Sequence, residues 1–502
     1  MTGRTRITAM ILMVVVIGVA SWWGRTASTE SFVQGPNLVL ITLDTTRADR
    51  LSCYDSLSAR TPNLDRLARH GVRFSRAISS AAVTPVSHAS MMTGLYPHAH
   101  GLRVLHGHEG FELDEKQITL AEVLGENGYR TGAFVSAFPA TRYFGLDQGF
   151  DLFDQEFPES ERGVPIPLAE AQRAGLRDTG QSQRGARETT DAALNWLGRL
   201  DSQRPFFLWV HYFDPHDIQL APPIEYLRRA GIDRRPTTDD EIRRLYDVEV
   251  EYMDEQIGRL LRDLDLSFES APKNRRETIV AVVSDHGEGL GDHDWWAHGI
   301  LYQEQIRVPL ILFGGSFRTG TAVDSVVRTV DLYPTLLEAA GIAELEPREL
   351  DGESLQTLTN PGATPATRHR TALADSINLT FYYWNIDRKR RNEKDERLYS
   401  LIDWPWKLIH HQYRPTESEL YNLQDDPDEL HNLAASRADK RSELEAQLRD
   451  TGAVTDRDFQ DPLLMDPEMV EKLKALGYLG EDAEEEEPDH TPTTKPNELP
   501  PE

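Results

Sequence analysis

A threonine opens a short segment, Thr84–Gly94, whose residue types suit nucleophilic chemistry. Threonine is favoured at the N-cap of a helix, proline in its first turn and glycine just past its end. The segment therefore predicts a short helix with Thr84 as N-cap, Pro85 at N1 and Gly94 after the last turn. The Thr84 hydroxyl then lies where backbone amides and the helix dipole favour an anion, and His88 shares its face. A threonine that only caps a helix is the ordinary alternative.

Acid and imidazole side chains gather in three other places along the chain. Asp285 and His286 stand side by side and are followed by glycines, while Asp44 and the run 211–216 each end an apolar stretch. A single acid after a strand is most often a turn residue, but carboxylate and imidazole together suit a divalent cation. They suit zinc or manganese better than calcium. The pattern predicts one bound divalent cation, Zn, Mn or Ca, beside a hydroxyl nucleophile.

These groups need a scaffold that brings distant segments together, and the apolar pattern predicts one. Runs apolar on both faces, as expected for central strands of a parallel sheet, cover 37–44, 205–214 and 278–285. Helical patterns cover 62–70, 118–127, 189–200 and 239–264. Alternating strands and helices predict an α/β fold with a large, mostly parallel sheet sandwiched by helices. Asp44, Asp214 and Asp285 then fall at the carboxyl ends of strands, where such sheets bind ligands.

The remaining segments differ in composition. Segment 158–188 predicts a surface insertion, and strand patterns at 398–411 and 419–423 predict a second, smaller lobe. We expect a targeting segment at 1–25, a linker at 26–35, a catalytic domain at 36–370, the small lobe at 371–440, a helical extension at 441–480 with a helix at 466–476, and an acidic disordered tail at 481–502.

Overall composition excludes some classes of function. The 502 residues hold 54 basic and 82 acidic side chains, and the net charge of −28 disfavours a nucleic-acid partner. An apolar fraction of 39% is enough for a large core. The single cysteine, Cys53, excludes an internal disulfide.

The first 25 residues predict export from the cytoplasm. Arg4 and Arg6 precede an uncharged, mostly apolar run at 7–23, and Arg25 follows it. This is the pattern of a signal peptide, and the run also reaches the lower limit of what spans a bilayer. Whether the segment is cleaved or stays as a single membrane anchor, we expect the body in the periplasm or cell envelope.

Taken together, the motifs resemble those of the sulfatase family in the alkaline phosphatase superfamily. The resemblance runs in order over roughly residues 36–434, through the segments 37–44, 61–65, 89–94, 214–216, 284–291, 302–309, 330–337, 351–355 and 419–427. It implies a large mixed sheet between helices and a small C-terminal antiparallel lobe. It also implies that Asp44, Asp285 and His286 bind the metal together with Thr84 at the nucleophile position, and that His216 contacts the substrate.

The nucleophile departs from the family pattern. Thr84 replaces the cysteine or serine that the family oxidises to formylglycine, and its β-methyl group would give a ketone instead of an aldehyde. Cys53 is no substitute, because the proline and arginine of that motif do not follow it. Thr45 stands where a second aspartate is frequent. In this feature the chain resembles those members of the wider superfamily that have a threonine nucleophile, which act on phosphate diesters and related phosphoesters.

The cationic residues of the family have changed as well. His88 and His298 take the places of an arginine and a lysine, and Ser136 and Phe138 fall on a lysine and a histidine. Most of the cations that would clamp a sulfate group are therefore replaced.

We predict a metal-dependent hydrolase of phosphate mono- or diesters with Thr84 as nucleophile. His88, His216 or His298 would protonate the leaving group, because imidazole titrates near neutral pH. A second cation on His216 and His298 is a further hypothesis. The alternatives are a sulfatase without the aldehyde, a phosphoryl-type transferase, and a non-catalytic binder of anionic glycans or envelope polymers. The expected partners are an anionic ester and, if the N-terminal helix is uncleaved, the membrane.

Overall fold

The structure, a computed structural model, describes residues 35–454 apart from 55–57, 104–111, 158–182, 202, 217–221, 233, 235, 267, 269–275, 319, 343–347, 360–369 and 379–395. The predicted targeting segment, most of the predicted insertion, the helix at 466–476 and the acidic tail lie outside the described residues. Within the described part of the chain, none of the helices combines the length and the apolar character that crossing a bilayer requires.

Eight strands form the main sheet, in the order β4-β3-β5-β1-β6-β7-β2-β8. They are β1 Asn37–Leu43, β2 Val72–Ile78, β3 Arg130–Phe134, β4 Leu152–Asp154, β5 Phe206–Tyr212, β6 Thr278–Ser284, β7 Arg307–Phe313 and β8 Thr321–Arg328. Strand β7 runs antiparallel to its neighbours β6 and β2, and the other pairs are parallel. The prediction of a large, mostly parallel sheet is confirmed.

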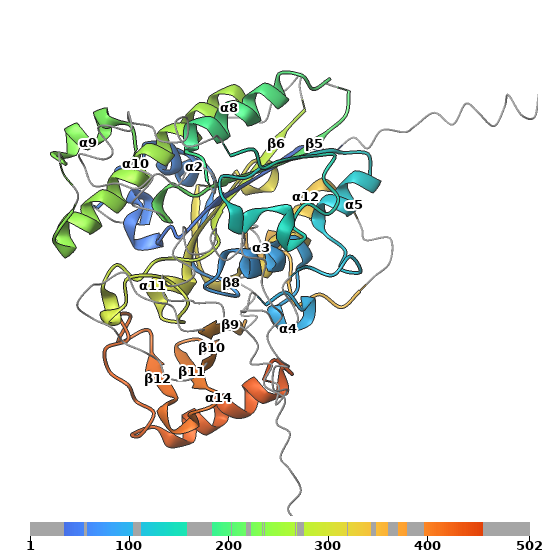
Figure 1. Cartoon of the computed structure of the whole chain (residues 1–502). Helices are drawn as coiled ribbons and strands as arrows, with labels where there is room; N and C mark the ends of the chain where they lie inside the picture. The colour runs from blue at the N-terminus through green and yellow to red at the C-terminus, as the bar shows by residue number, and fades with distance from the viewer. Residues whose placement is uncertain are drawn as a thin grey trace, which may run out of the picture.

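Helices cover both faces of this sheet (Figure 1). Leu38 and Leu40 of β1 enter one apolar core and Val39 and Ile41 the other, because successive side chains of a strand point to opposite faces. The first core packs against α3 Thr84–Thr93, α5 Leu120–Glu126 and α12 Leu332–Ala340, and the second against α2 Pro62–His70, α8 Ala186–Leu197 and α10 Asp239–Asp263. Burial on both faces explains why the central strands read as continuous apolar runs.

Local sequence signals explain where several helices begin. Thr119 and Glu122 form a capping box at the start of α5, and Thr238 and Glu241 do the same for α10. Helix α8 begins at Ala186, three residues before the predicted start, because Oδ1 of Asp214 accepts a hydrogen bond of 3.0 Å from the Ala186 amide. A side chain from another strand end therefore caps this helix, and no local pattern could have shown it. The shorter helices are α4 Pro97–His100, α9 Ile224–Ala230, α11 Gln303–Ile306 and α13 Gln356–Thr359.

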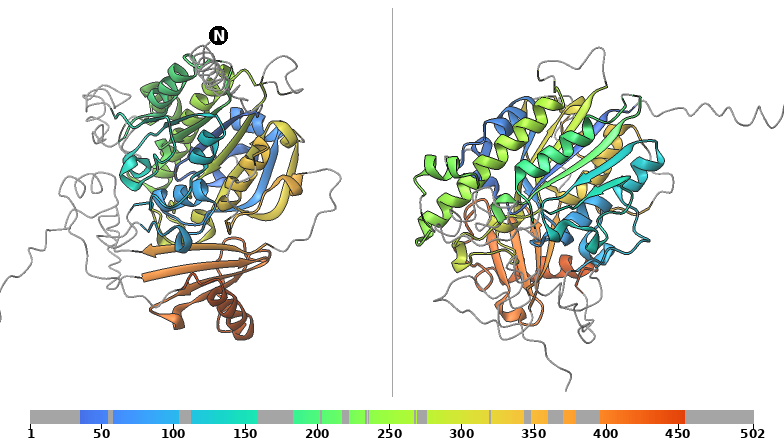
Figure 2. Two further views of the ribbon diagram at one scale, coloured as in Figure 1. Left: turned by 90° about the vertical axis from the view of Figure 1, so that its right-hand side faces the viewer. Right: turned by 45° about the horizontal axis from the view of Figure 1, so that its top comes forward.

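The predicted small lobe is a four-stranded antiparallel sheet in the order β12-β11-β10-β9. Its strands are β9 Ala372–Asn378, β10 Glu396–Asp403, β11 Trp406–His411 and β12 Glu419–Asn422. Helix α14, Ala438–Asp450, packs against this sheet through Leu444 and Leu448 (Figure 2). The lobe contacts the segments that precede α3 and α11, because the Asp375 amide donates to the Ser80 carbonyl at 3.0 Å and Ser376 Oγ donates to the Gly299 carbonyl at 2.7 Å.

Candidate active site

Three neighbouring strands of the main sheet carry the acids and one histidine of the site. Strand β1 lies between β5 and β6, and it runs parallel to both. Asp44 follows β1, Asp285 follows β6, and His211 lies in β5 opposite Thr42. The carboxyl ends of parallel strands meet at one edge of a sheet, so residues far apart in the chain converge there.

Helix α3 presents Thr84 to this edge. Oγ1 of Thr84 donates a hydrogen bond of 3.2 Å to Asp44 Oδ2 and lies 3.2 Å from His286 Nε2. The prediction that Thr84 is the N-cap is wrong: Thr84 is the first residue of the helix, Val83 is the N-cap, and no side chain caps it. The hydroxyl donates to the acid and lies beside the imidazole. Gly94 ends the helix as predicted, in the left-handed conformation with φ 72°.

Asp44, Asp285 and His286 form a buried group that suits a divalent cation. Each offers one ligand atom, and these atoms lie within 4.8 Å of one another. Oδ1 of Asp44 and Oδ2 of Asp285 are buried and accept no hydrogen bond from a described residue. His286 Nδ1 donates to the Gly287 carbonyl at 2.9 Å, which leaves the lone pair of Nε2 directed at Thr84. Oxygen and nitrogen donors thus converge, and two of the carboxylate oxygens accept no hydrogen bond within the described part of the chain, as expected of a metal site.

The electrostatics of these three residues follow from their burial. Burial raises the pKa of Asp44 and of Asp285 well above the ordinary value, and repulsion by the Asp44 carboxylate adds to the rise for Asp285. Burial also lowers the pKa of His286 to about 3, so its imidazole is neutral. Two ionised carboxylates in this position need a cation beside them.

His211 lies in the cluster 211–216 that the sequence indicated, but the sequence predictions gave it no role in the site. Its Nε2 lies 3.1 Å from Asp44 Oδ2, and its Nδ1 lies 3.4 Å from the Ser136 amide, which donates to it. Because Nδ1 accepts, Nε2 carries the proton and donates to Asp44. Burial lowers the pKa of His211 to about 3 and keeps it neutral. The signal in the sequence was a histidine inside an apolar run. In the structure this run is β5, which pairs with β1, the strand that Asp44 follows.

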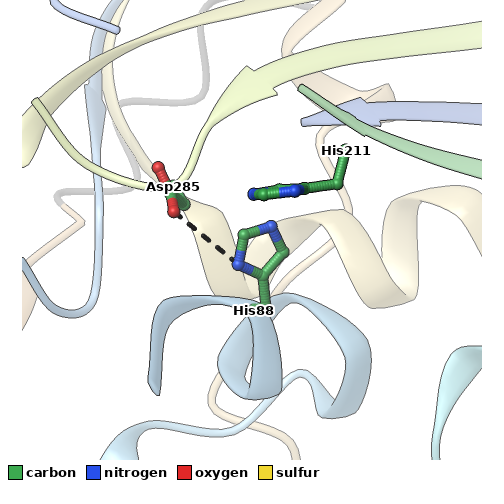
Figure 3. Close-up of side chains that lie close together, drawn as sticks. All are labelled: His88, His211 and Asp285. Carbon is green, nitrogen blue, oxygen red and sulfur yellow. Dashed lines mark ion pairs between the residues drawn. The ribbon is translucent and has the colours of Figure 1, made fainter. Parts of the chain in front are cut away.

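His88 lies below Asp285 and His211 in the view of Figure 3. Its Nδ1 donates to the Thr84 carbonyl at 2.8 Å and lies 3.7 Å from Asp285 Oδ2. Its Nε2 lies 3.0 Å from Thr42 Oγ1. The Thr42 oxygen already accepts a hydrogen bond of 2.9 Å from the Trp209 indole, so it donates its own proton to His88.

Both ring nitrogens of His88 are therefore engaged by the protein. These contacts favour a role in positioning α3 over the predicted role as proton donor. The three residues of Figure 3 also offer ligand atoms within 4.8 Å of one another. A cation there would have to displace the hydrogen bonds of His88 and His211, so the set with Asp44 and His286 fits a cation better.

His216 and His298 form a pair beside His286. Their Nε2 atoms lie 3.1 Å apart, and the centroid of the His298 ring lies 4.3 Å from that of His286. His216 closes the short 3-10 turn after β5, and His298 lies in the loop that follows Asp285. Burial and neighbouring imidazoles lower the pKa of both well below the ordinary value. The structure thus brings His298, and through it His216, next to the candidate metal group.

The positions that depart from the family pattern have other surroundings. Ser136 donates through Oγ to the His211 carbonyl, and Phe138 packs against the rings of Tyr143 and Phe144. Cys53 is partly buried against the second apolar core, and burial raises the pKa of its thiol to about 12. Cys53 is therefore a poor nucleophile, as the sequence indicated.

Comparisons with known proteins agree with this architecture. The sulfatase family model matches residues 36–342, and a model described as the C-terminal part of N-sulphoglucosamine sulphohydrolase matches residues 291–453. N-acetylglucosamine-6-O-sulfatase of Bacteroides thetaiotaomicron is 24% identical over 83% of this chain and 86% of its own. Arylsulfatase K of Mus musculus is 24% identical over 88% and 84%.

A solved structure extends the range of reactions among similar folds. The phosphonate monoester hydrolase of Agrobacterium radiobacter superposes with a TM-score of 0.64, at 22% identity over 84% of this chain and 96% of that one. Most of the named relatives are sulfatases, so the comparisons favour the sulfate-ester alternative over the predicted phosphate ester. Enzymes of this family use a divalent metal, and the chain holds candidate ligands for one. The chain belongs to the sulfatase family and is a hydrolase of ester bonds.

Proposed function

We propose that the chain hydrolyses phosphate esters through a covalent intermediate on Thr84. The observation that carries this proposal is the Thr84 hydroxyl, held 3.2 Å from both Asp44 and His286. Thr84 carries a methyl group on Cβ and cannot become the aldehyde of the family's formylglycine. The hydroxyl itself is then the nucleophile, a role that suits displacement at phosphorus.

Asp44, Asp285 and His286 would hold the divalent cation. When bound, the cation supplies Lewis acidity toward the ester oxygen and lowers the pKa of the nearby hydroxyl. His211 keeps Asp44 in place by donating to its Oδ2 at 3.1 Å, while Oδ1 of Asp44 is buried and accepts no hydrogen bond from a described residue.

In the first step, a bond forms between Thr84 Oγ1 and phosphorus while the bond from phosphorus to the leaving oxygen breaks. The hydroxyl proton passes to Asp44 Oδ2, its acceptor in the structure. The His216–His298 pair supplies a proton to the leaving oxygen. Both imidazoles are neutral at rest, but the charge of a bound anionic ester raises the pKa of a neighbouring imidazole. Water then displaces Thr84 from phosphorus and returns a proton to the pair, while Thr84 regains its proton from Asp44. The product is inorganic phosphate from a monoester substrate and a phosphate monoester from a diester substrate.

Sulfate esters are the second candidate, and the names of the relatives favour them. Water would have to remove a sulfuryl group from Thr84 by hydrolysis. Release through a formylglycine aldehyde is excluded, because Thr84 carries a β-methyl group. The residues of the site thus favour a phosphate ester as substrate, whereas similarity to named sulfatases favours a sulfate ester. A transferase and a non-catalytic binder stay possible outcomes of the same test.

The test is a release assay on an aryl phosphate monoester, an aryl phosphate diester and an aryl sulfate. Metal is removed with a chelator and Zn²⁺, Mn²⁺ or Ca²⁺ is restored. We expect the native protein to release the aryl alcohol from at least one of the two phosphate substrates, and this release to fall by about 10³-fold or more in Thr84→Ala. Sulfate release faster than both phosphate reactions would replace the first candidate by the second. Equal turnover by Thr84→Ala would overturn the nucleophile.

A further inference from the structure

The loop between β6 and α11 folds back on itself like a hairpin, with His293 at its tip. The Gly289 amide donates to the Ala297 carbonyl at 2.9 Å, which closes the base of the loop. The Gly291 amide donates to the Trp295 carbonyl, also at 2.9 Å, nearer the tip. The residue that follows Ala297 is the loop histidine of the proposed proton-donating pair. The loop therefore connects its tip with the active site.

The tip has a backbone conformation that its residue types do not favour. Leu290, His293 and Asp294 have φ values of 50°, 49° and 58°, in the left-handed region. Side chains with a Cβ atom rarely adopt this region, which glycine enters without steric cost. Contacts with the rest of the protein must therefore hold the tip in place.

His293 makes such contacts with two parts of the molecule. Its Nδ1 lies 2.9 Å from Glu304 Oε1 on α11, and its Nε2 lies 3.3 Å from the Glu429 carbonyl of the small lobe. Its ring stacks on that of Tyr302, with the centroids 3.8 Å apart and an angle of 2° between the planes. His293 thus joins the loop to the main domain and to the small lobe.

The two hydrogen bonds of His293 require a charged ring. A carbonyl oxygen and an ionised carboxylate can only accept, so both ring nitrogens must donate, and the ring is an imidazolium. Burial disfavours this charge, but the contacts with Glu304 and Glu429 outweigh burial and raise the pKa of His293 above its ordinary value. A ring that loses its proton also loses one of the two hydrogen bonds.

The other charged groups around the ring come from several elements. They are Arg47 and Asp49 after β1, Asp292 and Asp294 beside the ring, Arg307 of β7, and Lys407, Asp428 and Glu429 of the small lobe. Arg47 binds Asp49 and Asp292, each at 2.7 Å. Lys407 binds the Glu429 carboxylate at 2.6 Å. Glu304 is thus the acid whose carboxylate binds the ring itself.

A contact within the loop links the tip to the site. The indole nitrogen of Trp295, two residues after His293, donates to the His298 carbonyl at 3.3 Å. Nδ1 of His298 donates in turn to the carbonyl of Ala82, two residues before Thr84, at 2.8 Å. A displaced tip would move Trp295 and, through it, the backbone of His298.

We propose that His293 is a positioning residue, whose imidazolium ties the loop to the small lobe and thereby holds His298 at the site. The neutral ring keeps only one of its two hydrogen bonds, so loss of the proton frees the tip. The tie is therefore strongest where the ring is charged and weakens as the ring titrates at higher pH. Its effect on turnover rests on the proposed function, in which the His216–His298 pair supplies a proton to the leaving oxygen.

Hydrogen–deuterium exchange of the full-length protein, followed by mass spectrometry, tests the tie directly. Exchange rates are corrected for their intrinsic pH dependence and compared between the native protein and His293→Gln from pH 6 to pH 9. Glutamine keeps an N–H donor and does not titrate. Over residues 287–300 we expect native protection to exceed that of the variant by about 10-fold at pH 6, as for one charge-assisted hydrogen bond, and to approach it at pH 9.

Two controls accompany this comparison. Peptides over β1 should be equally protected in both proteins at every pH. His431→Gln removes a histidine of the small lobe whose side chain is 78% exposed, and its loop should behave as in the native protein.

Turnover of the ester that the native protein cleaves gives a second readout. The ratio of native to His293→Gln kcat cancels the titrations that both proteins share. We expect this ratio to be about 10 at pH 6 and to approach 1 at pH 9, with KM changed less than kcat. A constant ratio alongside converging protection would disprove the link from the tip to His298.

Equal loop protection in the two proteins, or a difference that does not change with pH, would overturn the proposal. If the thermal unfolding curve shows that His293→Gln does not fold, the native protein decides alone. Its loop protection must then fall between pH 6 and pH 9, and protection that does not fall overturns the tie. The proposed function fails separately, because a chain that cleaves none of the three esters disproves that function while the exchange experiment still decides the role of His293.

Discussion

The hydroxyl oxygen of Thr84 lies 3.2 Å from Nε2 of His286, although 202 positions separate the two residues in the chain. The contact joins the start of α3 to the loop that follows β6. His286 offers this nitrogen because its other ring nitrogen donates to the Gly287 carbonyl. The relationship places the proposed nucleophile beside the candidate ligand atoms for a cation. Changes at the hydroxyl should therefore affect turnover, and changes at the ligands should affect metal binding.

Replacing Thr84 should separate the hydroxyl from the shape of its side chain. Thr84→Ser keeps a nucleophilic oxygen, and we expect it to retain activity within about 100-fold of the native protein. Thr84→Val keeps the volume and loses the oxygen, so turnover should fall by about 10³-fold or more. Intact-mass spectrometry of acid-quenched reactions should show a phosphorylated chain in the native protein and in Thr84→Ser. Its absence from Thr84→Val serves as the control, and an equal signal in that variant would contradict the assignment.

Removing the metal should make stability depend on pH through Asp44 and Asp285. Burial raises the pKa of both carboxyls, so the folded metal-free protein holds protons that the unfolded chain has lost. Its stability should therefore fall as pH rises above the ordinary carboxylate pKa near 4, until the raised pKa is passed. Thermal unfolding in a chelator should show this fall, and Asp285→Asn should show less of it. Added Zn²⁺ should raise the unfolding temperature by several degrees at pH 8 and by less at pH 5, where protons compete; an equal rise would count against this metal group.

His211 should act by positioning Asp44. His211→Leu removes the hydrogen bond to Asp44 Oδ2, and we expect metal affinity to fall by about 10–100-fold. His211→Gln can place an amide N–H near the same point and should recover part of that loss. The measurement is a metal titration with a competing chelator, together with kcat and KM at saturating metal. A loss of activity that excess metal does not repair, with unchanged metal affinity, would instead assign His211 a direct role in the reaction.

Asp214 should lower the stability of the folded protein at neutral pH. Burial raises its pKa to about 7, so between pH 4 and 7 the unfolded state ionises first and stability falls as pH rises. Above pH 7 the raised pKa of Asp214 should lower the free energy of unfolding by about 4 kcal/mol, because this pKa rises from about 4 to about 7 on folding. Asp214→Asn cannot ionise, and its amide oxygen can still accept from Ala186. Urea unfolding at pH 5 and pH 8 should show a growing advantage for the variant; a constant difference would disprove the raised pKa.

The buried ion pair of the small lobe should be essential to its stability. Lys407 Nζ lies 2.6 Å from Glu429 Oε1, with both side chains fully buried, and Glu429 Oε2 also accepts from the Gln303 amide at 2.6 Å. Lys407→Met leaves an uncompensated carboxylate, and we expect a loss of about 3–5 kcal/mol in urea unfolding. The double variant with Glu429→Gln should recover part of this loss. If the double variant is less stable than Lys407→Met, the penalty does not come from the unpaired charge.

Much of the fold could be read from local patterns. Helix α2 begins and ends where the sequence predicts, and the apolar runs that became β1 and β6 are followed by Asp44 and Asp285. Such features are local: side-chain propensity, capping residues and the width of the apolar face decide them within a few residues. The composition of the candidate site was predictable for the same reason, because acids and imidazoles stood at the ends of strand patterns.

Only the tertiary structure decided which of these side chains meet. The order β5-β1-β6 places Asp44 between His211 and Asp285, and this order depends on pairing between strands more than 160 residues apart. The partner of the Thr84 hydroxyl, the contact of His88 Nε2 with Thr42 and the contact between His216 and His298 likewise depend on residues distant in sequence. A sequence specifies which groups are available. Their distances and protonation depend on burial and hydrogen bonds that exist only once the sheet has assembled.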